Sequence, residues 1–139
     1  MGAVIATRNT VFEGSGTKSR NRKYHAEFNA FKKAGERKDL REAILYTTLE
    51  PCSIRKHPPK SCLEYILDSN IKRVVIGMLD PNPGICGRGA GLLERNGVDV
   101  GFFPPNLRDE IRLLNMKFIR EQSDLKTIGI ERAYRDQAA

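Results

Sequence analysis

Three side chains that bind zinc, with one carboxylate beside them, carry the clearest chemistry in this sequence. His25, Cys52 and Cys62 offer one imidazole and two thiolates, and Glu27 follows His25 by two positions. Three protein ligands leave the fourth tetrahedral position of a zinc ion to water, as in catalytic rather than structural sites. Because zinc lowers the pKa of that water toward neutrality, these residues predict a metal-assisted hydrolysis.

Glu27 is the candidate proton carrier. It lies at a predicted helix start, where it flanks the ligand His25 and can approach the water without replacing it. A carboxylate there can accept the proton of the water and pass it to a ring nitrogen and a departing amine. The order His-Ala-Glu, Pro51-Cys52 and a second cysteine is the signature of zinc deaminases that act on nucleobase rings. A structural zinc knot, or cysteines that bind no metal, would leave Glu27 without a role.

The segment between the two cysteines is longer than in the common signature. Nine residues separate Cys52 from Cys62, where the common pattern has two. Loop closure at this length costs only a modest entropy. We interpret His57, beside two prolines in this loop, as a surface or substrate-edge residue rather than an alternative ligand.

Further motifs extend beyond the metal ligands. In chain order they are Gly2-Ala3-Val4-Ile5, His25-Ala26-Glu27, Tyr46-Thr47-Thr48-Leu49-Glu50-Pro51-Cys52-Ser53, Asp80-Pro81-Asn82-Pro83 and Gly87-Arg88-Gly89. Together they span about residues 2–103 and resemble the pyrimidine deaminase domain of riboflavin biosynthesis. The resemblance implies a cytidine deaminase-like α/β fold, a three-layer α/β/α arrangement with a mixed sheet of about five strands.

The same resemblance implies roles for individual residues. It places the zinc ligands at His25, Cys52 and Cys62, and the catalytic carboxylate at Glu27. It places substrate contacts in the loop that holds Asp80 and Asn82. The implied substrate is a phosphorylated diaminopyrimidine. Since no reductase domain follows, we expect a stand-alone relative of the two-domain riboflavin enzyme, and a pyrimidine-type substrate that can differ from the one used in that pathway.

Basic residues lie on both sides of the predicted site. The chain has a net charge of +7, and part of it is contributed by Lys18, Arg20, Arg22, Lys23, Arg55, Lys56 and Lys60. A substrate phosphate would be attracted there, so we predict substrate contacts from Lys23 and Arg55. Single-stranded nucleic acid is the alternative ligand, although the basic segments lack interleaved aromatic residues beyond Tyr24. A solvated loop without function is the other interpretation.

Length and composition favour one enzyme domain. The 139 residues are 40% hydrophobic, and we predict a deaminase domain over residues 1–121 followed by a tail over 122–139. No apolar run is long enough for a membrane span, and no signal segment begins the chain.

Cys86 is left without a disulfide partner and is interpreted as a small buried residue, which favours a reducing cytoplasm. We expect a homo-oligomer, because proteins of this fold often build sites across subunits. A zinc-stabilised binding module without catalysis is the alternative class.

Apolar runs and helical spacing alternate along the chain. We expect strands over Ala3–Thr7, Val11–Glu13, Ile44–Leu49, Arg73–Met78 and Val98–Phe103. Helices are expected from His25 to about Arg37, around Leu63 to Leu67, around Leu92, and from Asn106, as the N-cap, through Leu107, Ile111, Leu114 and Phe118. This order predicts helices on both faces of the sheet. It also places His25 and Cys62 at helix starts, where the helix dipole favours thiolates and anions.

Overall fold

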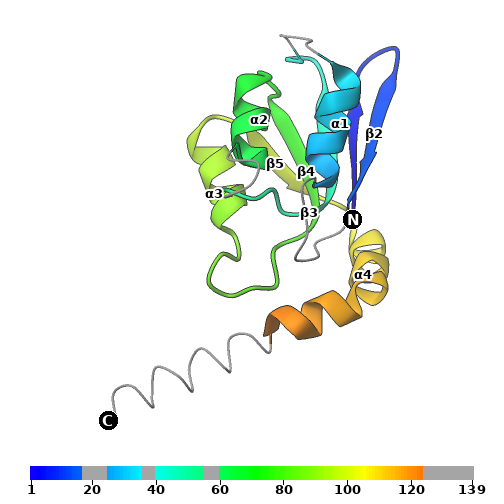
Figure 1. The fold of residues 1–139 in the computed structure, drawn as a ribbon, viewed down its shortest axis with the longest axis vertical. Helices are drawn as coiled ribbons and strands as arrows, with labels where there is room; N and C mark the ends of the chain where they lie inside the picture. Colours follow the sequence, from blue (N-terminus) through cyan, green and yellow to red (C-terminus); the bar gives the residue numbers. More distant parts are fainter. Residues whose placement is uncertain (17–24, 36–39, 55–59, 124–139) are drawn as a thin grey trace.

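A computed structural model of the protein describes residues 1–16, 25–35, 40–54 and 60–123 (Figure 1). The basic segment before His25, most of the loop between the zinc-binding cysteines, and residues 124–139 lie outside this range. Lys23, Arg55 and His57 are therefore outside the described residues. Within the described part, no helix is both long and apolar enough to cross a lipid bilayer.

A five-stranded mixed sheet forms the centre of the molecule, with the strand order β2-β1-β3-β4-β5. β1 pairs antiparallel with β2 and with β3, while β3, β4 and β5 run parallel. The strands are Gly2–Ala6 (β1), Val11–Ser15 (β2), Ile44–Leu49 (β3), Arg73–Met78 (β4) and Asp99–Phe102 (β5). β2 reaches two residues beyond the predicted Glu13, because Gly14 and Ser15 pair with the start of β1.

Helices cover both faces of this sheet, which confirms the predicted three layers. The helices are Ala26–Ala34 (α1), Cys62–Asp68 (α2), Arg88–Arg95 (α3) and Pro105–Leu114 (α4). α1, α2 and α3 lie side by side on one face, and α4 lies on the other (Figure 1). α4 packs near the carboxyl end of β4, where Ile111 fills the space that a side chain at Gly77 would take.

The hydrophobic core lies between the sheet and the layer formed by α1, α2 and α3. Alternate strand residues point to one face of a sheet, and the inward set includes Ile5, Leu45, Val74 and Ile76. Each of these four is fully buried. Their partners from the helices are Ala30, Phe31, Leu63, Ile66, Ala90 and Leu93. This packing fixes the starts of α1 and α2 at the carboxyl ends of β3 and β4.

The last predicted helix differs from the structure in two ways. Its N-cap is Pro104 and not Asn106, which lies inside the helix. Pro105 is the first residue of the helix. The N–H group that proline lacks would have no acceptor within the helix at this position, so the helix can begin before Asn106. The helix also ends at Leu114. Asn115 forms a turn, its side chain donating to the carbonyl of Ile111 at 2.7 Å, and residues 116–123 form a separate helical segment.

α4 docks less deeply than its apolar spacing predicted. None of its residues, all of which are described, is buried. Leu113 and Leu114 are 71% and 85% exposed. The helical segment 116–123 crosses the predicted boundary between domain and tail, so that boundary stays a prediction.

Gly14 allows β2 to lie directly against the start of α1. A Cβ at this position would stand 2.0 Å from the carbonyl oxygen of Ala26 and 2.5 Å from the nitrogen of Ala30. We expect Gly14→Ala to lower the free energy of unfolding by about 1–3 kcal/mol, because backbone must move to admit the methyl group. Urea denaturation measures this change.

Gly91→Ala is the matched control for Gly14. Gly91 lies inside α3 with open space at its Cβ position, and alanine is the better helix former by about 0.5–1 kcal/mol. This variant should be as stable as the parent or more stable. Equal destabilisation by both substitutions would contradict the close contact between β2 and α1.

Candidate active site

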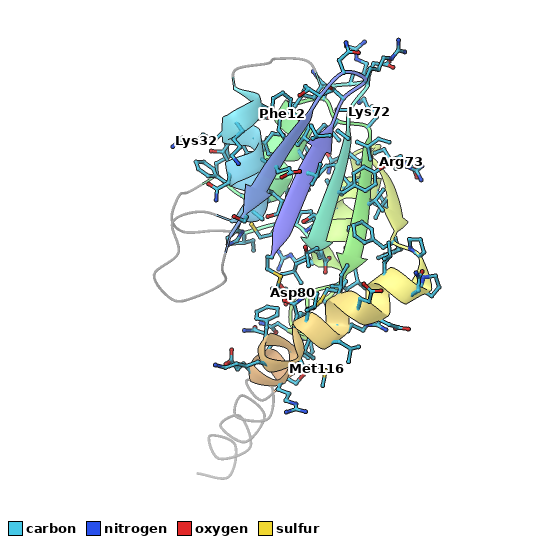
Figure 2. The ribbon with its side chains drawn as sticks, turned by 90° about the vertical axis from the view of Figure 1, so that its right-hand side faces the viewer. Phe12, Lys32, Lys72, Arg73, Asp80 and Met116 are labelled. Atoms are coloured by element: carbon cyan, nitrogen blue, oxygen red, sulfur yellow. The ribbon has the colours of Figure 1, made fainter. Side chains whose placement is uncertain are left out.

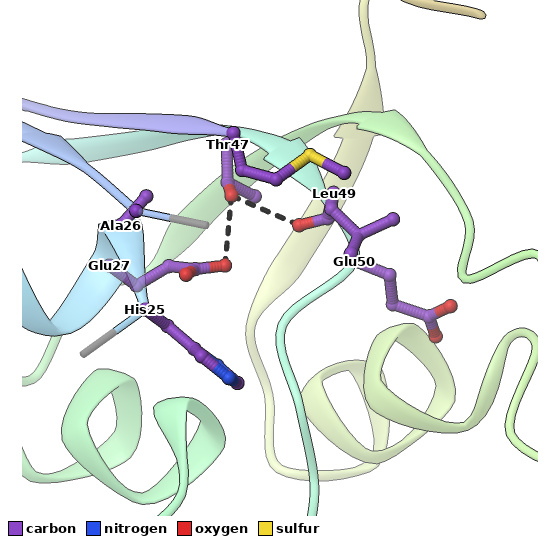
Figure 3. Close-up of a pocket in the computed structure, with 8 residues that line it drawn as sticks. His25, Ala26, Glu27, Thr47, Leu49 and Glu50 are labelled. Carbon is purple, nitrogen blue, oxygen red and sulfur yellow. Dashed lines mark hydrogen bonds between the residues drawn. The ribbon is translucent and has the colours of Figure 1, made fainter. Parts of the chain in front are cut away.

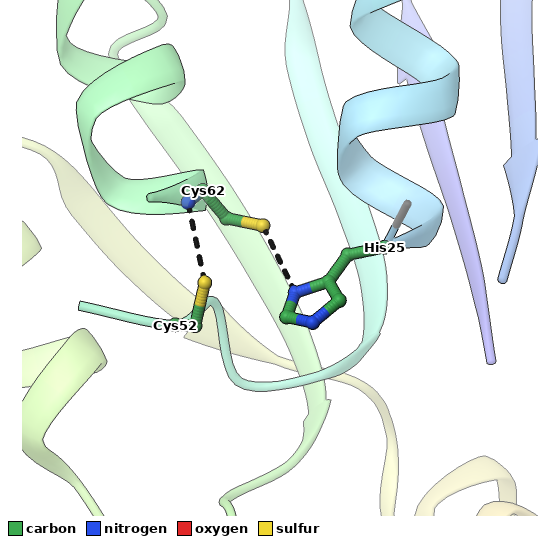
Figure 4. A group of neighbouring side chains, drawn as sticks. All are labelled: His25, Cys52 and Cys62. Carbon is green, nitrogen blue, oxygen red and sulfur yellow. Dashed lines mark hydrogen bonds between the residues drawn. The ribbon is translucent and has the colours of Figure 1, made fainter. Parts of the chain in front are cut away.

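His25, Cys52 and Cys62 come together at the carboxyl end of β3 (Figure 4). His25 is the N-cap of α1, Cys62 is the first residue of α2, and Cys52 lies in the irregular segment that follows β3. Their ligand atoms all lie within 4.8 Å of one another. The predicted placement of His25 and Cys62 at helix starts is confirmed.

The start of α2 holds Cys52 in place. Ser61 caps the helix: its hydroxyl accepts from the backbone N–H of Glu64 while its own N–H donates to the Glu64 carboxylate. The next two backbone N–H groups then point at Cys52. Cys62 donates to the Cys52 sulfur at 3.3 Å, and Leu63 donates to the Cys52 carbonyl at 3.0 Å.

This environment favours the thiolate of Cys52. The hydrogen bond with the Cys62 side chain and the proximity of His25 lower the pKa of the Cys52 thiol to about 4, against the effect of burial. A thiolate is the form of cysteine that binds metal. At neutral pH Cys52 is therefore ready to act as a ligand.

The three donors fit zinc in both chemistry and spacing. Nδ1 of His25 lies 3.5 Å from the Cys62 sulfur. Two such donors on one tetrahedral zinc would be separated by about 3.6 Å, given Zn–S and Zn–N bonds of roughly 2.3 and 2.0–2.1 Å. His57 lies outside the described residues, and the described Cys86 is not part of the cluster. One imidazole and two sulfurs can thus hold a zinc ion that keeps a further position for water.

Glu27 lies beside the cluster, on the inner side of α1 (Figure 3). Its side chain is 6% exposed, and the Thr47 hydroxyl lies 3.0 Å from its Oε1. Burial raises the pKa of the Glu27 carboxyl and outweighs the lowering by a backbone hydrogen bond, by His25 and by the Thr47 hydrogen bond. A carboxyl with a raised pKa holds a proton more readily than an ordinary carboxylate, as a residue that accepts a proton and passes it on must do.

Thr47 is a site residue that the sequence pattern did not reveal. Its hydroxyl lies 3.0 Å from Glu27 Oε1 and also 3.0 Å from the carbonyl oxygen of Leu49. A hydroxyl has a single proton, so it donates to one of the two at a time. One feature of the sequence could have indicated this role: Thr47 is a polar residue between Leu45 and Leu49, on the face of β3 that points into the core.

We expect Thr47→Val to lower kcat by roughly fivefold, because one hydrogen bond of about 1 kcal/mol no longer orients the Glu27 carboxylate. KM and zinc content should stay close to those of the parent. Steady-state kinetics measures both constants, and Thr47→Ser, which restores the hydroxyl, is the matched control. A serine variant as slow as the valine variant would contradict this role of the hydroxyl.

Asp80 and Asn82 shape their own loop. Oδ1 of Asp80 accepts from the backbone N–H of Asn82 at 2.9 Å, and Oδ1 of Asn82 accepts from Gly84 at 3.0 Å. Asp80 is buried and lies at the carboxyl end of β4, opposite the end marked by Lys72 and Arg73 (Figure 2). Substrate contact by these two side chains stays a prediction.

Glu50 links this loop to the pocket beside the metal cluster. It lines the pocket with His25, Glu27 and Thr47 (Figure 3). Its carboxylate also accepts from the backbone N–H of Asp80 at 2.8 Å. Glu50 belongs to the motif that contains Cys52, but its role could not be predicted there because its hydrogen-bond partners lie 30 or more residues away along the chain.

Cys86 is exposed, so its interpretation as a small buried residue was wrong. The glycine-containing turn between Asn82 and Gly87 lies at the surface, and its geometry exposes the thiol. Partial burial and then the charges of Glu50 and Asp80 raise the pKa of Cys86. The thiol therefore stays protonated at neutral pH, which does not favour a reactive role.

The fold and the metal cluster together define a cytidine deaminase-like zinc protein. The family model of the cytidine and deoxycytidylate deaminase zinc-binding region matches residues 1–78. This chain belongs to that family. The match covers the predicted ligands His25, Cys52 and Cys62 and the carboxylate of Glu27.

Named relatives come from riboflavin biosynthesis. A diaminohydroxyphosphoribosylamino-pyrimidine deaminase of Buchnera aphidicola (subsp. Schizaphis graminum) is 40% identical over 101 residues, covering 72% of this chain and 65% of that protein. The riboflavin biosynthesis protein RibD of Bacillus amyloliquefaciens is 39% identical over 120 residues, covering 86% of this chain and 30% of that protein. The chain thus spans about a third of the length of such RibD relatives.

Solved structures agree with the sequence comparison. RibD of Acinetobacter baumannii superimposes with a TM-score of 0.70 at 31% identity, covering 88% of this chain and 33% of that one. The corresponding deaminase/reductase of Thermotoga maritima gives a TM-score of 0.67 at 33% identity, with 90% and 34% covered. The predicted cytidine deaminase-like fold is confirmed.

Proposed function

We propose that this protein is a zinc-dependent hydrolase that replaces an exocyclic amine of a pyrimidine-type ring by oxygen and releases ammonia. The observation that carries the proposal is the cluster of His25, Cys52 and Cys62 with the buried Glu27 beside it. A structural zinc site needs no such carboxylate. Zinc bound there would lower the pKa of a water molecule in its fourth position and so supply the nucleophile.

The chain's own residues then manage protons and geometry. The Glu27 carboxylate would take one proton from the water and pass it to the ring nitrogen. It would then take the second proton from the hydroxyl added to the ring carbon and pass it to the departing amine, which leaves as ammonia. The Thr47 hydroxyl would hold that carboxylate in one orientation. Burial of Glu27 keeps bulk water away from the transferred proton, and its raised pKa helps the carboxyl to hold a proton between the two transfers.

We infer that the substrate is a phosphorylated aminopyrimidine of the type used by the riboflavin deaminases. The names of the Buchnera and RibD relatives support this substrate class. Lys23 and Arg55, which lie close in sequence to the ligands His25 and Cys52, are candidates for the phosphate, and Asp80 and Asn82 for the ring or ribose. The chain belongs to a family that also includes deoxycytidylate deaminases, so the assay must distinguish these substrates.

A side-by-side assay of ammonia release tests this proposal. The substrates are a diaminopyrimidine ribotide, its dephosphorylated form, cytidine, deoxycytidylate and a single-stranded oligonucleotide. We expect kcat/KM to be highest for the ribotide and to fall by at least about tenfold without the phosphate, because a charge-assisted hydrogen bond is lost. Turnover of the oligonucleotide alone, falling steeply with salt, would instead establish a nucleic-acid deaminase.

We also infer a homo-oligomer in a reducing compartment. Leu107, Leu113 and Leu114 of α4 are exposed, as is Met116 just after it, and such a group of exposed apolar side chains on one segment supports an interface between copies. The three cysteines form no disulfide, and two of them are needed as thiolates. Light scattering of the purified protein would measure the mass, and a monomeric mass would contradict the oligomer.

A further inference from the structure

The buried carboxylate of Glu50 is fully engaged with backbone donors from a distant part of the chain. The side chain is 3% exposed. One oxygen accepts from the N–H groups of Asp80 at 2.8 Å and Gly87 at 3.0 Å, and the other accepts from Ala90 at 3.0 Å. Carboxylate bonds to backbone N–H groups are charge-assisted and stronger than neutral ones.

These donors belong to the two ends of one loop. Asp80 begins the loop after β4, and Gly87 ends it as the N-cap of α3. Gly87 has a positive φ of 76° and offers no side chain to cap the helix. The first N–H groups of a helix have no acceptor within it, so Glu50, which directly follows β3, caps α3 from a distant part of the chain. One side chain therefore holds the loop closed at both ends.

The same segment is attached to the metal cluster. Glu50 is followed by Pro51 and then by Cys52, a predicted zinc ligand. Gly89, in the first turn of α3, lies so close that a Cβ would stand 2.1 Å from the carbonyl oxygen of Pro51. The start of α3 thus contacts the segment before Cys52 at two points, the Glu50 carboxylate and the backbone of Pro51.

We propose that Glu50 is a positioning residue that sets the loop of residues 80–87 at a fixed place relative to the metal cluster. The loop carries Asp80 and Asn82, so its position decides whether these side chains meet a substrate held near Glu27. This inference rests on the proposed function, in which the loop contacts the substrate. Glu50 acts through the loop, and its effect falls on substrate binding more than on proton transfer.

Glu50→Gln tests the proposal with little change of shape. The amide places N–H donors where the carboxylate accepted three N–H groups, so at least one bond is replaced by repulsion. We expect backbone hydrogen exchange across residues 80–90 to rise by at least about tenfold. KM for the diaminopyrimidine ribotide should rise by a similar factor while kcat stays within about threefold, with one zinc still bound.

Glu42→Gln is the matched control, because Glu42 is an exposed glutamate before β3, at the other end of that strand. It should leave hydrogen exchange, KM and kcat unchanged. Gly89→Ala is a second test that keeps the carboxylate but forces α3 away from Pro51. It should raise exchange across residues 80–90 and raise KM in the same way, and it carries the test if Glu50→Gln does not fold.

Unchanged exchange and unchanged KM in both Glu50→Gln and Gly89→Ala would overturn the proposal. Loss of kcat and zinc with no change of KM would also overturn it, because Glu50 would then serve the metal cluster instead. Hydrogen exchange needs no turnover. A parent protein that deaminates none of the tested compounds would refute the proposed function, while exchange would still decide whether Glu50 holds the loop.

Discussion

Replacing Glu27 by glutamine should reduce ammonia release by about 10²–10⁴-fold while the protein keeps its fold and its zinc. The amide keeps the size of the side chain and can still accept from the Thr47 hydroxyl through its oxygen. It cannot take a proton from water at neutral pH. The three predicted ligands, His25, Cys52 and Cys62, are untouched, so metal analysis should give the parent zinc content.

The fold should tolerate this change well. Burial raises the pKa of Glu27 in the metal-free protein, so the folded state disfavours the carboxylate, and stability falls as pH rises through that pKa. A neutral amide removes this unfavourable contribution. The metal-free variant should therefore unfold no more easily than the parent at neutral pH. Loss of zinc together with activity would mean that Glu27 is a ligand and would contradict its role as proton carrier.

Replacing Cys62 by alanine should remove zinc and much of the thermal stability that zinc confers. Cys62 is 1% exposed, and its sulfur lies 3.5 Å from Nδ1 of His25. With one of three protein ligands lost, we expect zinc affinity to fall by more than about 100-fold. Mutating a residue that only hydrogen-bonds to a metal ligand already lowers metal affinity by about 10–100-fold. Zinc content after dialysis and Tm with and without chelator measure the effect.

Cys86→Ala is the matched control, because Cys86 is the exposed cysteine outside the cluster. Zinc content and Tm should match those of the parent, and chelator should lower Tm in both. Metal binding stabilises the folded state according to the ratio of free zinc to Kd. Zinc loss in the Cys86 variant, or its retention in the Cys62 variant, would contradict the ligand assignment.

Residue types and local spacing were enough to predict the chemical centre of this molecule. The His-Ala-Glu motif singled out His25 and Glu27, and the structure brings His25, Cys52 and Cys62 together although nine residues separate the two cysteines. The roles of these residues as zinc ligands and proton carrier stay predictions. Runs of apolar and β-branched residues located all five strands to within about two residues at each end. These features depend on neighbours close in sequence, or on a metal that restricts which residue types can bind it.

Features that depend on packing between distant segments were not predicted. Thr47 and Glu50 acquire their roles from partners 20 to 40 residues away. The N-cap of α4 was misplaced at Asn106 because a favourable capping residue competed with a proline that can begin the helix earlier. Cys86 was expected to be buried because cysteine is a small residue that is often found in protein cores. The residue type does not show which side of a turn faces water, and here the thiol is exposed.

The residues that contact the substrate were the hardest part of the site to predict from the sequence. Asp80 and Asn82 were expected to face a ligand, and the structure shows one oxygen of each bonded within the loop. The position of this loop relative to the metal cluster decides whether the two side chains can meet a substrate, which is why Glu50 matters. Lys23 and Arg55 lie outside the described residues, and their contact with a phosphate stays a proposal.

The most direct test of the central claim is the reaction of the zinc-loaded protein with the diaminopyrimidine ribotide in ¹⁸O-labelled water. We predict one ammonia released per product formed, and a product that carries one ¹⁸O at the carbon that lost the amine. The Glu27→Gln variant and a sample of unlabelled product incubated with the enzyme control for uncatalysed reaction and exchange. Zinc-loaded, folded protein that releases no ammonia from any tested aminopyrimidine would contradict the account and favour a zinc-stabilised binding module.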